Sequence, residues 1–443
     1  MMTNNRGFKR RNSKCSGGAR IPLALLSMLF LPLVACDNLL EVEIPGSVFE
    51  GDLHDPRLAT TLAHGAQADF ECAFKTHQET TGLWTDEFEV SGAARDLGVI
   101  GARLPFITIY GQVTGCGSMT ALWTPLHVAR FQGERSAEIL AEFEDADVPN
   151  KQFLIGKSLV HAGWAYVLLA EDYCELTFNV GPKVARSVGF TTAIARFGTA
   201  LTALASASGS DAAEAANLMN FARVGRARAN LNLGNGSAVG ADASAVPADY
   251  IRTAYGDASD ERLYSAGFVD RNTVLVGGTY TVHPRFRSLT IPYAGGAGSV
   301  VDTRVPTTHI GMGLGHDGIA DYWAQTKYTS RSDDIRIADY WEAQLMIAEV
   351  AAGSAAAVTI VNALRAHHSL PAYDATGKTA AEIVEVVREE RRRTLFLEGV
   401  RMGDKLRWGE AWDTGVSDHG TAYGTDTCIP LQEAETLNNP NLF

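Results

Sequence analysis

The sequence lacks the short motifs by which many enzymes activate a nucleophile, bind a phosphate or hold a catalytic zinc ion. It contains no Gly-x-Ser-x-Gly, no phosphate-binding Gly-Lys-Ser/Thr loop and no His-Glu-x-x-His. A glycine-rich stretch, residues 311–316, lacks the flanking strand and helix of a dinucleotide site, so it is interpreted as a loop. His367 and His368 end a helical pattern, where a histidine pair is more often exposed than metal-bound. These patterns predict no cofactor, no metal and no catalytic residue.

Positive charge is scarce, with 38 Lys and Arg against 51 Asp and Glu and a formal net charge of -13. Six of the positive charges fall within residues 1–35, and removing them lowers the net charge from -13 to -19. Such an acidic chain repels nucleic acid, which proteins bind mainly through Lys and Arg contacts to phosphate. It also gains nothing from an anionic lipid surface, so any membrane attachment has to come from a lipid anchor.

The apolar run near the start, residues 21–35, is shorter than the roughly 20 residues that a transmembrane helix needs. It follows a basic leader and ends in Leu33-Val34-Ala35, directly before Cys36. A charged leader, a short apolar core and a small residue at the cleavage point describe a secretory signal peptide. A cysteine directly after such a site is typical of bacterial lipoproteins, in which the thiol is acylated. We expect residues 1–35 to be a signal peptide and Cys36 the lipidated residue; the alternative is an ordinary signal peptide with a chance cysteine.

Cysteine is rare, with six in the chain, and no two of them form a Cys-x-x-Cys unit, so zinc is not expected. Cys15 is lost with the leader and Cys36 would carry the lipid. In an oxidising compartment the other four favour disulfides with three possible pairings: Cys72, Cys116, Cys174 and Cys428. We favour Cys72–Cys116 as a local closure, and Cys174–Cys428 as a link between an early helix and the C-terminal tail.

Apolar residues recur every three or four positions over most of residues 36–236, which predicts a helical scaffold. Small residues at regular places in paired helices resemble tetratricopeptide repeats, although close packing of alanine-rich helices explains the pattern equally well. Residues 82–118 lack the pattern and are expected to form a long loop, of the kind that often carries function. The predicted helices cover residues 57–78, 120–144, 152–173, 190–207 and 211–233.

The second half of the chain divides into an irregular and a helical part. Residues 237–330 are rich in Gly, Ser, Thr and Asp and are expected to be an irregular ligand-side insertion with a few short strands. Helical patterning returns in residues 331–443, where Thr379 and Glu382 have the spacing of a capping box. The chain is therefore expected to fold, over residues 36–443, as one mainly α domain with long irregular loops.

The last helix carries a dense group of charges beside the apolar residues Leu395–Leu397. Glu390 and Arg393 are spaced to pair along the helix, and Glu398 and Arg401 are close enough to bridge at its end. A charge cluster beside apolar residues is usually an ion-pair network that locks a helix end into the protein. The predicted structural cluster is Glu390, Arg391, Arg393, Glu398, Arg401 and Asp404.

This C-terminal run resembles the SusD/RagB family of outer-membrane nutrient-uptake lipoproteins, whose segment reads approximately I-x-x-E-R-R-x-E-L-x-F-E-G-x-R-x-x-D-L-x-R-W. The chain departs from it where Thr394 or Leu395 replaces the usual Glu. Residues 336–349 and the closing residues 429–441 are also similar to family segments. The matching residues are Glu390, Arg391, Arg392, Phe396, Glu398, Gly399, Arg401, Asp404, Leu406 and Trp408.

The resemblance implies a SusD-like fold, with tetratricopeptide-like helix pairs as a scaffold and loops that build a ligand face. It implies a protein without enzymatic activity that binds a glycan or other oligomeric nutrient. It further implies delivery of that nutrient to a SusC-like, TonB-dependent β-barrel transporter. The protein would act from a lipid anchor in the outer membrane, facing the cell surface.

In relatives the ligand face comes from the loop after the first helices and from the central irregular region. Sugars present C–H faces that stack on aromatic rings, and hydroxyls that bond carboxylates and guanidinium groups. The corresponding segments hold the candidates Trp84, Asp86, Glu89, Arg95, Asp96, Tyr110, Arg285, Tyr322 and Trp323. Four further tryptophans lie in helical patterns and are assigned to the core: Trp123, Trp164, Trp341 and Trp408.

Two other functions stay open at this point. A secreted hydrolase on a helical scaffold would use an acidic pair such as Asp86/Glu87 or Asp333/Asp334, as glycosidases do. With 51 acidic residues in the chain, however, such pairs arise by chance. A lipoprotein that only docks other proteins through its helix pairs is the third reading.

Overall fold

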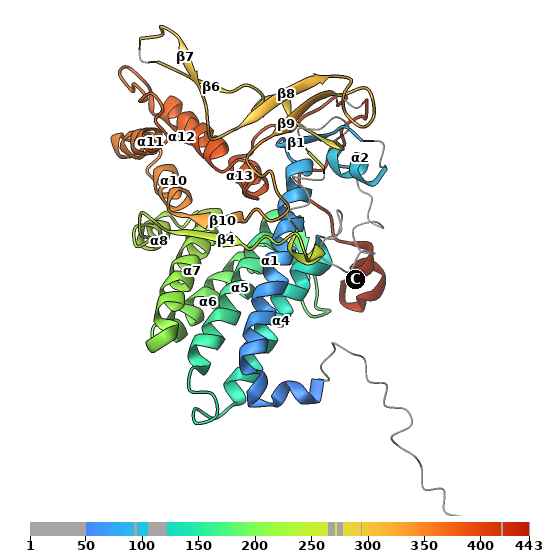
Figure 1. Ribbon diagram of the computed structural model, residues 1–443, viewed down its shortest axis with the longest axis vertical. Coiled ribbons are helices and arrows are strands. Elements are labelled where there is room, and N and C mark those ends of the chain that lie inside the picture. The colour runs from blue at the N-terminus through green and yellow to red at the C-terminus, as the bar shows by residue number, and fades with distance from the viewer. Residues whose placement is uncertain are drawn as a thin grey trace, which may run out of the picture. The chain divides into compact units, whose positions relative to one another are not determined.

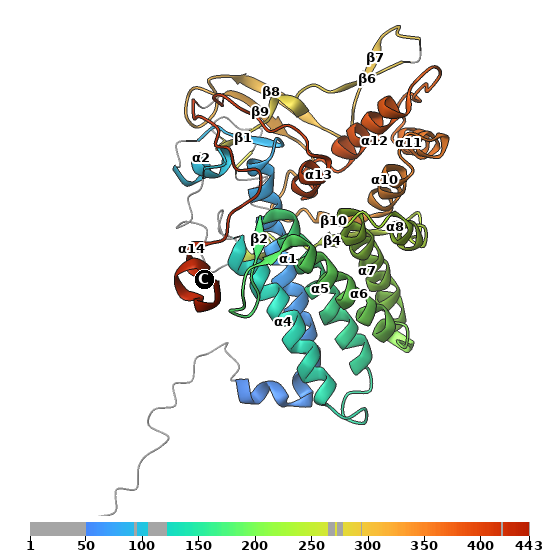
Figure 2. The ribbon, with the colours of Figure 1, turned by 180° about the vertical axis from the view of Figure 1, so that it is seen from behind.

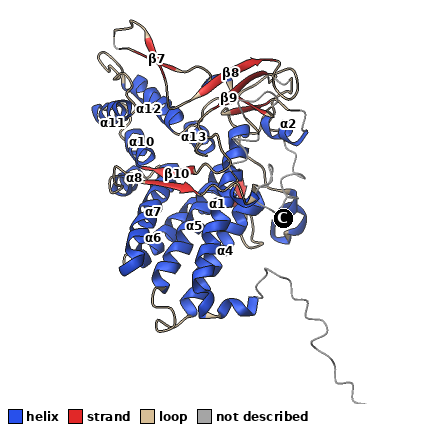
Figure 3. Ribbon diagram, viewed as in Figure 1, coloured by secondary structure: helices blue, strands red, loops and turns tan. Residues whose placement is uncertain are grey.

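The computed structural model describes residues 50–92, 95–104, 122–264, 271–272, 278–293, 295–417 and 420–442. The predicted signal peptide and Cys36 lie outside these residues, as do Tyr110 and Cys116. Within the described part the chain is mainly helical with few short strands, as predicted (Figure 3).

Long helices from the first half of the chain form a bundle (Figure 1). These are α1 (Ala59–Trp84), α4 (Trp123–Glu142), α5 (Lys151–Asp172), α6 (Arg186–Leu204) and α7 (Ala212–Asn232). Helix α5 packs against the other four, and every residue from Phe153 to Asp172 is buried. By length and composition α5 could cross a membrane, but its complete burial identifies it as the core helix of the bundle.

Glycine allows these helices to approach closely. A Cβ atom at Gly133 of α4 would lie 2.8 Å from the carbonyl oxygen of Ser158 in α5. A Cβ atom at Gly225 of α7 would lie 2.4 Å from the ring of Phe197 in α6. The small residues noted in the sequence therefore mark helix crossings in a close-packed interior.

The C-terminal helices lie beyond the end of the bundle (Figure 2). They are α10 (Tyr340–Val350), α11 (Ala355–His367), α12 (Ala380–Thr394) and α13 (Arg401–Trp408), whereas α8 (Gly236–Ala243) follows α7 and α14 (Glu433–Asn438) lies beside the bundle (Figures 1 and 2). Helix α12 begins with the predicted capping box between Thr379 and Glu382. Helix α13 packs on α1 and α5, so the end of the chain returns to the first helices.

The sheets of the described residues are five antiparallel strand pairs. The pairs are β1 (Phe88–Val90) with β5 (Tyr280–Val282), β4 (Ile251–Ala254) with β10 (Ile335–Asp339), β2 (Glu175–Leu176) with β3 (Val184–Ala185), β6 (Thr290–Pro292) with β7 (Ser299–Val301), and β8 (Thr307–Met312) with β9 (Asp321–Gln325). Pairing of Phe88 with Val282 joins the segment after α1 to the central region.

The segment predicted as a loop, residues 82–118, is more regular than expected where it is described. Residues 82–84 complete α1, residues 88–90 form β1, and Arg95–Gly101 form α2. Helix α1 runs past its predicted end at Gln78 because its last turns are buried, and packing stabilises a helix more than residue propensity does.

Cys174 and Cys428 form a disulfide with their Cα atoms 5.1 Å apart, which is the pairing that the sequence analysis favoured. Beside it, the Ile429 N–H donates to the carbonyl oxygen of Asp172 at 2.9 Å. The C-terminal tail is thus attached to the end of α5 by covalent and backbone bonds. Cys72 is buried in α1, whereas its predicted partner lies outside the described residues.

Replacing Cys174 and Cys428 by serine should lower the free energy of unfolding by about 2–5 kcal/mol. The bond joins residues 254 positions apart, so its loss frees a long segment of the unfolded chain. Denaturant unfolding of the oxidised proteins measures the effect, and Cys174→Ser alone should lose as much as the double variant. Equal stability of all three proteins, or free thiols at both positions in peptide mapping, would contradict this expectation.

Candidate functional site

Several charged residues of α12 pair with distant parts of the chain. Glu390 is fully buried and bonds Arg304 and Arg365, each at 2.5 Å. Arg393 pairs with Glu389 of its own helix at 2.6 Å and contacts Asp302 at 3.2 Å, so these described side chains do not form the predicted Glu390–Arg393 pair. A buried carboxylate needs direct partners, and here the guanidinium groups that face it come from other segments.

Glu398 and Arg401, the second predicted pair, also have separate partners in the described structure. Glu398 bonds Lys327 at 2.6 Å and Arg336 at 3.3 Å. Arg401 forms a bidentate pair with Asp86 at 2.6 and 2.8 Å. The C-terminal cluster is therefore a buried ion-pair network, but its pairs connect segments far apart in sequence.

A row of alternating charges runs from the bundle to α13. Glu171 of α5 accepts from Arg228 of α7 at 2.9 and 2.5 Å. Glu342 of α10 lies 3.6 Å from Arg228 and 3.7 Å from Arg391, and Arg391 donates to Asp404 at 2.8 Å. Each of these side chains is at most 2% exposed, so each charge depends on its neighbours and not on water.

The row ends at Trp408. Asp404 bonds Arg407 at 2.7 Å, and Arg407 forms a bidentate pair with Glu349 at 2.8 and 3.0 Å. Glu349 then accepts the indole N–H of Trp408 at 2.7 Å. Burial would raise the pKa of Asp404, but Arg391 and Arg407 outweigh it and lower that pKa. Burial raises the pKa of Glu342, farther along the row, to about 7, so the indole is oriented by the hydrogen bonds from Asp404 through Arg407 to Glu349.

The turn between α12 and α13, residues 395–400, is bound by side chains of the bundle. Gly399 has a φ of 68°, and a Cβ atom there would lie 3.0 Å from the ring of His77. The Gly399 carbonyl accepts from His77 at 3.0 Å and from Arg228 at 2.9 Å. A glycine is required because the left-handed backbone and the close histidine ring leave no room for a side chain.

His77 donates from both ring nitrogens. Its Nδ1 faces Asp172 Oδ2 at 2.8 Å and its Nε2 faces the Gly399 carbonyl oxygen at 3.0 Å. The carbonyl can only accept, and an ionised Asp172 also only accepts, so beside the carboxylate the ring carries two protons; burial raises the pKa of Asp172 as well. Burial lowers the pKa of His77, but Asp172 and the carbonyl outweigh it and raise that pKa. His77 and Asp172 are therefore a buried ion pair beneath the turn.

Asp86, a predicted ligand residue, is fully buried among three cations. It accepts from Arg401 and from Lys405 at 3.0 Å, and it forms an ion pair with Arg285 at 3.0 Å. Burial would raise its pKa, but Arg401, Lys405 and Arg285 hold that pKa well below its usual range. The prediction that Asp86 contacts a ligand is corrected: it is the structural counter-ion of this part of the protein.

Three more candidates are buried in the described structure. Trp84 in the last turn of α1 and Tyr322 in β9 are 0% exposed, and Glu89 in β1 is 7% exposed. Tyr322 lies against Gly278, where a Cβ atom would clash with the phenol ring. Glu89 accepts from the hydroxyl of Tyr423 at 2.8 Å. These three side chains pack beneath the surface. Their spacing in the sequence does not tell buried residues from exposed ones.

Arg95 and Asp96 open α2, but their side chains lie outside the described part of the structure. They stay predictions, as does Tyr110.

Trp323, by contrast, is partly exposed and belongs to a surface cluster on β8 and β9. His309 stacks on its ring with centroids 4.6 Å apart. Asp321 accepts from the indole N–H at 2.8 Å, bonds His309 at 2.7 Å and lies 3.4 Å from Arg287. The cluster combines an aromatic surface, a carboxylate and a guanidinium group, the chemistry expected at a sugar site.

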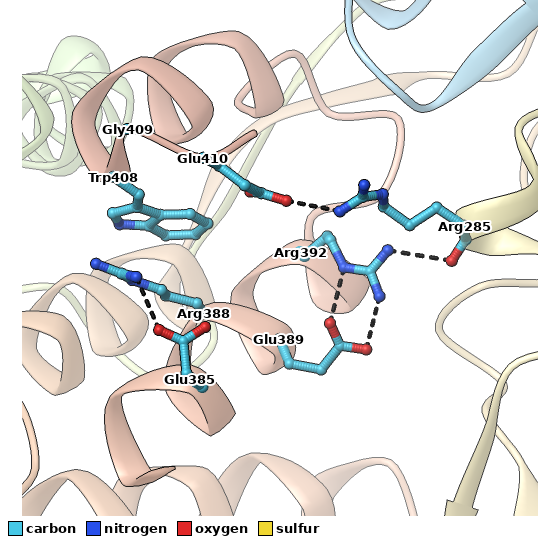
Figure 4. A pocket seen from close by; sticks show the side chains of 8 residues that line it. All are labelled: Arg285, Glu385, Arg388, Glu389, Arg392, Trp408, Gly409 and Glu410. Carbon is cyan, nitrogen blue, oxygen red and sulfur yellow. Dashed lines mark hydrogen bonds and ion pairs between the residues drawn. The ribbon is translucent and has the colours of Figure 1, made fainter. Parts of the chain in front are cut away.

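Arg285, the remaining candidate, lines a pocket of about 310 Å³ where α12, α13 and the 3-10 turn Pro284–Phe286 meet (Figure 4). Three arginines and three glutamates dominate its lining, so its charges balance. The lining residues are Arg285, Glu385, Arg388, Glu389, Arg392, Trp408, Gly409 and Glu410.

Two ion pairs of the pocket are firmly held. Arg392 and Glu389 form a bidentate pair at 2.8 and 2.7 Å, and Arg285 bonds Glu410 at 2.7 Å (Figure 4). Burial would raise the pKa of Glu389, but Arg392 and its neighbour Arg393 outweigh it and lower that pKa. The pocket therefore presents ionised groups of both signs.

Trp408 and Trp341 are half-buried, so their assignment to the core is wrong. Trp408 instead forms part of the pocket wall, with the Arg388 guanidinium 5.4 Å from its ring centroid (Figure 4). Sequence reasoning also missed the charged lining residues of α12. Their spacing at positions 385, 388, 389 and 392 places them on one helix face, which was a usable signal.

The described residues contain no group of three or more His, Cys, Asp or Glu arranged to hold a metal ion.

Glu87 is a buried carboxyl group beside the turn of residues 395–400. Its Oε1 accepts the backbone N–H of Leu397 at 2.7 Å. Burial raises the pKa of Glu87 from 4.5 to about 7, since this hydrogen bond and the more distant cations compensate only in part. The folded protein therefore binds this proton more tightly than the unfolded chain does.

Protein stability should fall as pH rises from about 5 to 8, because the folded state then loses the Glu87 proton that the unfolded chain has already released. The pKa difference corresponds to about 3 kcal/mol. Glu87→Gln should remove this contribution, so the stability of the variant relative to wild type should rise over that range. Denaturant unfolding at several pH values measures it, and parallel curves for the two proteins would contradict it.

Asp86→Ala should lower the free energy of unfolding by about 3–5 kcal/mol, because it leaves Arg401 and Lys405 buried without their anion. The control is Glu138→Gln, which removes an exposed partner of Arg135 on α4 and should change stability little. Thermal or denaturant unfolding compares the two variants. A loss for Asp86→Ala no larger than that of the control would refute the structural role of Asp86.

Residues 249–439, which include β10 and helices α10 to α13, match the SusD family. No curated protein sequence matches the chain.

Solved structures extend the likeness to most of the chain. A SusD-like carbohydrate-binding protein from Bacteroides vulgatus is 14% identical with a TM-score of 0.61, covering 88% of this chain and 97% of its own. A SusD-like protein from Bacteroides fragilis is 13% identical with a TM-score of 0.64, covering 89% and 98%. A laminarin-binding SusD-like protein is 14% identical with a TM-score of 0.59, covering 86% and 98%. At these identities the likeness establishes the fold.

Proposed function

We propose that this chain, a SusD-like protein by its fold and by the family match of residues 249–439, captures a carbohydrate or similar oligomeric nutrient. In this proposal Cys36 carries a lipid anchor in the outer membrane, and the protein faces the cell surface. It delivers its ligand to a SusC-like, TonB-dependent β-barrel transporter. The observation that carries the proposal is the SusD-like fold itself, which spans nearly the full length of the solved relatives.

The surface chemistry supports a carbohydrate ligand. The Trp323 cluster and the charge-balanced pocket both combine an aromatic ring with carboxylate and guanidinium groups. Sugar hydroxyls both donate and accept hydrogen bonds, so they suit such mixed surfaces. Two of the solved relatives are named for binding carbohydrate, one of them laminarin.

The Cys174–Cys428 disulfide supports export, since structural disulfides form in oxidising compartments. It agrees with the predicted signal peptide of residues 1–35.

The pocket does not favour a hydrolase. A glycosidase needs one carboxylic acid that stays protonated and a second carboxylate to act as base or nucleophile. Arg392 and Arg393 lower the pKa of Glu389, and Arg285 and Arg401 both bond Glu410. Glu389 with its lowered pKa is a poor proton donor, so ligand capture without turnover fits the pocket better.

The proposed partner is tested by purifying the tagged, lipidated protein from its own membranes in mild detergent and identifying what accompanies it by mass spectrometry. A TonB-dependent barrel should be the main partner. Cys36→Ser is the matched control, because without a lipid anchor the protein should leave the membrane fraction. Recovery of the lipidated protein without any barrel would contradict delivery to a transporter.

A further inference from the structure

We propose that the pocket between α12 and α13 binds a single uncharged sugar ring, which stacks on the indole of Trp408. This inference rests on the proposed capture of carbohydrate and names the part of the ligand that this pocket takes. Four features of the pocket carry it: its volume, its charge balance, the fixed position of Trp408 and the loose attachment of Arg388.

The volume sets the size of the ligand. Pockets that bind small molecules usually measure about 300–1,000 Å³. At about 310 Å³ this pocket lies at the lower limit, so it accommodates one ring and not a stretch of polymer. The ring would be a terminal or branching unit whose neighbours extend over the surface outside.

The charge balance sets the polarity of the ligand. The guanidinium groups of the pocket have carboxylate partners, as in the Arg392–Glu389 and Arg285–Glu410 pairs. An uncharged ring with hydroxyl groups can accept from these arginines and donate to these glutamates without separating either pair. A uronic acid would bring a further negative charge against Glu389 and Glu410, whose arginine partners are already paired, and would be favoured only by releasing Arg388 from its exposed pair with Glu385.

The firmly held side chains are already arranged for binding. Arg392 also donates to the Arg285 carbonyl at 3.1 Å and lies over the ring of Phe286. Glu410 is held by Arg401 as well as by Arg285. Such side chains lose little freedom when a ligand arrives, which favours affinity.

Arg388 is the loosely attached member of the pocket. It pairs with Glu385 at 2.8 Å, but the Glu385 side chain is 68% exposed and that of Arg388 is 33% exposed. Exposed pairs of this kind contribute little to stability, so the guanidinium can be displaced. Because Glu349 holds the Trp408 N–H, the indole stays in place and its face becomes available to the C–H face of a sugar.

The test uses the mature protein labelled with 5-fluorotryptophan and observed by ¹⁹F NMR. The chain has seven tryptophans, and Trp408→Phe identifies the Trp408 resonance. The probes are glucose, galactose and mannose, and the uronic acids of the same sugars. At least one neutral sugar should shift the Trp408 resonance saturably, and its uronic acid should bind about tenfold more weakly or less.

Two variants sharpen the test. Glu389→Gln removes one negative charge from the lining, so it should weaken neutral-sugar binding and improve the relative affinity of the uronic acid. Arg388→Ala should bind neutral sugars at least as well as wild type, since the displaced side chain is gone. Glu138→Gln removes the equivalent exposed i,i+3 partner of Arg135 on α4, outside the pocket, and should leave every titration unchanged.

The proposal is overturned if no neutral sugar shifts the Trp408 resonance, or if neutral sugars and uronic acids bind equally well. Recovery of a TonB-dependent barrel together with an unresponsive Trp408 would overturn the sugar pocket alone. A responsive Trp408 without any barrel partner would overturn delivery to a transporter while leaving the sugar pocket in place.

Discussion

Buried ion pairs around the turn of residues 395–400 connect the helical bundle to the C-terminal helices. The turn has to carry left-handed backbone at Gly399, and its carbonyl group is bound from below by His77 and Arg228. Each buried charge there would be costly alone, so the partners have to arrive together from α1, α5, α7 and α10. The position of α12 and α13 on the bundle follows from this requirement, as does the position of the pocket residues on these two helices.

The candidate site inherits its geometry from this network. The charge row that starts at Glu171 ends with Glu349 holding the indole of Trp408, and the cations around Asp86 include Arg285, which lines the same pocket. The inner walls of the pocket are therefore fixed by the partly buried Arg392–Glu389 and Arg285–Glu410 pairs, while its outer edge consists of the more exposed Glu385–Arg388 pair. A rigid interior with a displaceable side chain at the entrance suits reversible capture of a ligand better than catalysis, which would need a carboxylic acid free to give up a proton.

Much of the fold could be predicted from residue patterns, and much of the site could not. The helix periods, the capping box at Thr379 and the Cys174–Cys428 pairing are visible in the chain because they depend on local spacing or on few alternatives. The partners of Glu390 and Glu398 could not be predicted from the sequence, because they are cations from distant segments that come close only in the folded chain. The same limit explains why Asp86 looked like a ligand residue, and why Trp408 looked like a core residue although α13 ends at the surface.

Hydrogen exchange in wild type and Asp404→Asn tests the central claim that the buried charge row positions the pocket. Asp404 connects Arg391 to Arg407, so its neutral replacement interrupts the row between the bundle and Trp408. The account predicts a marked loss of protection in residues 401–410 and in the turn of residues 395–400, with α4 and α6 unchanged. Unchanged protection in residues 401–410 would contradict it, and would mean that the Asp86 ion pairs of Arg401 and Lys405, together with apolar packing, hold α13 and its pocket in place.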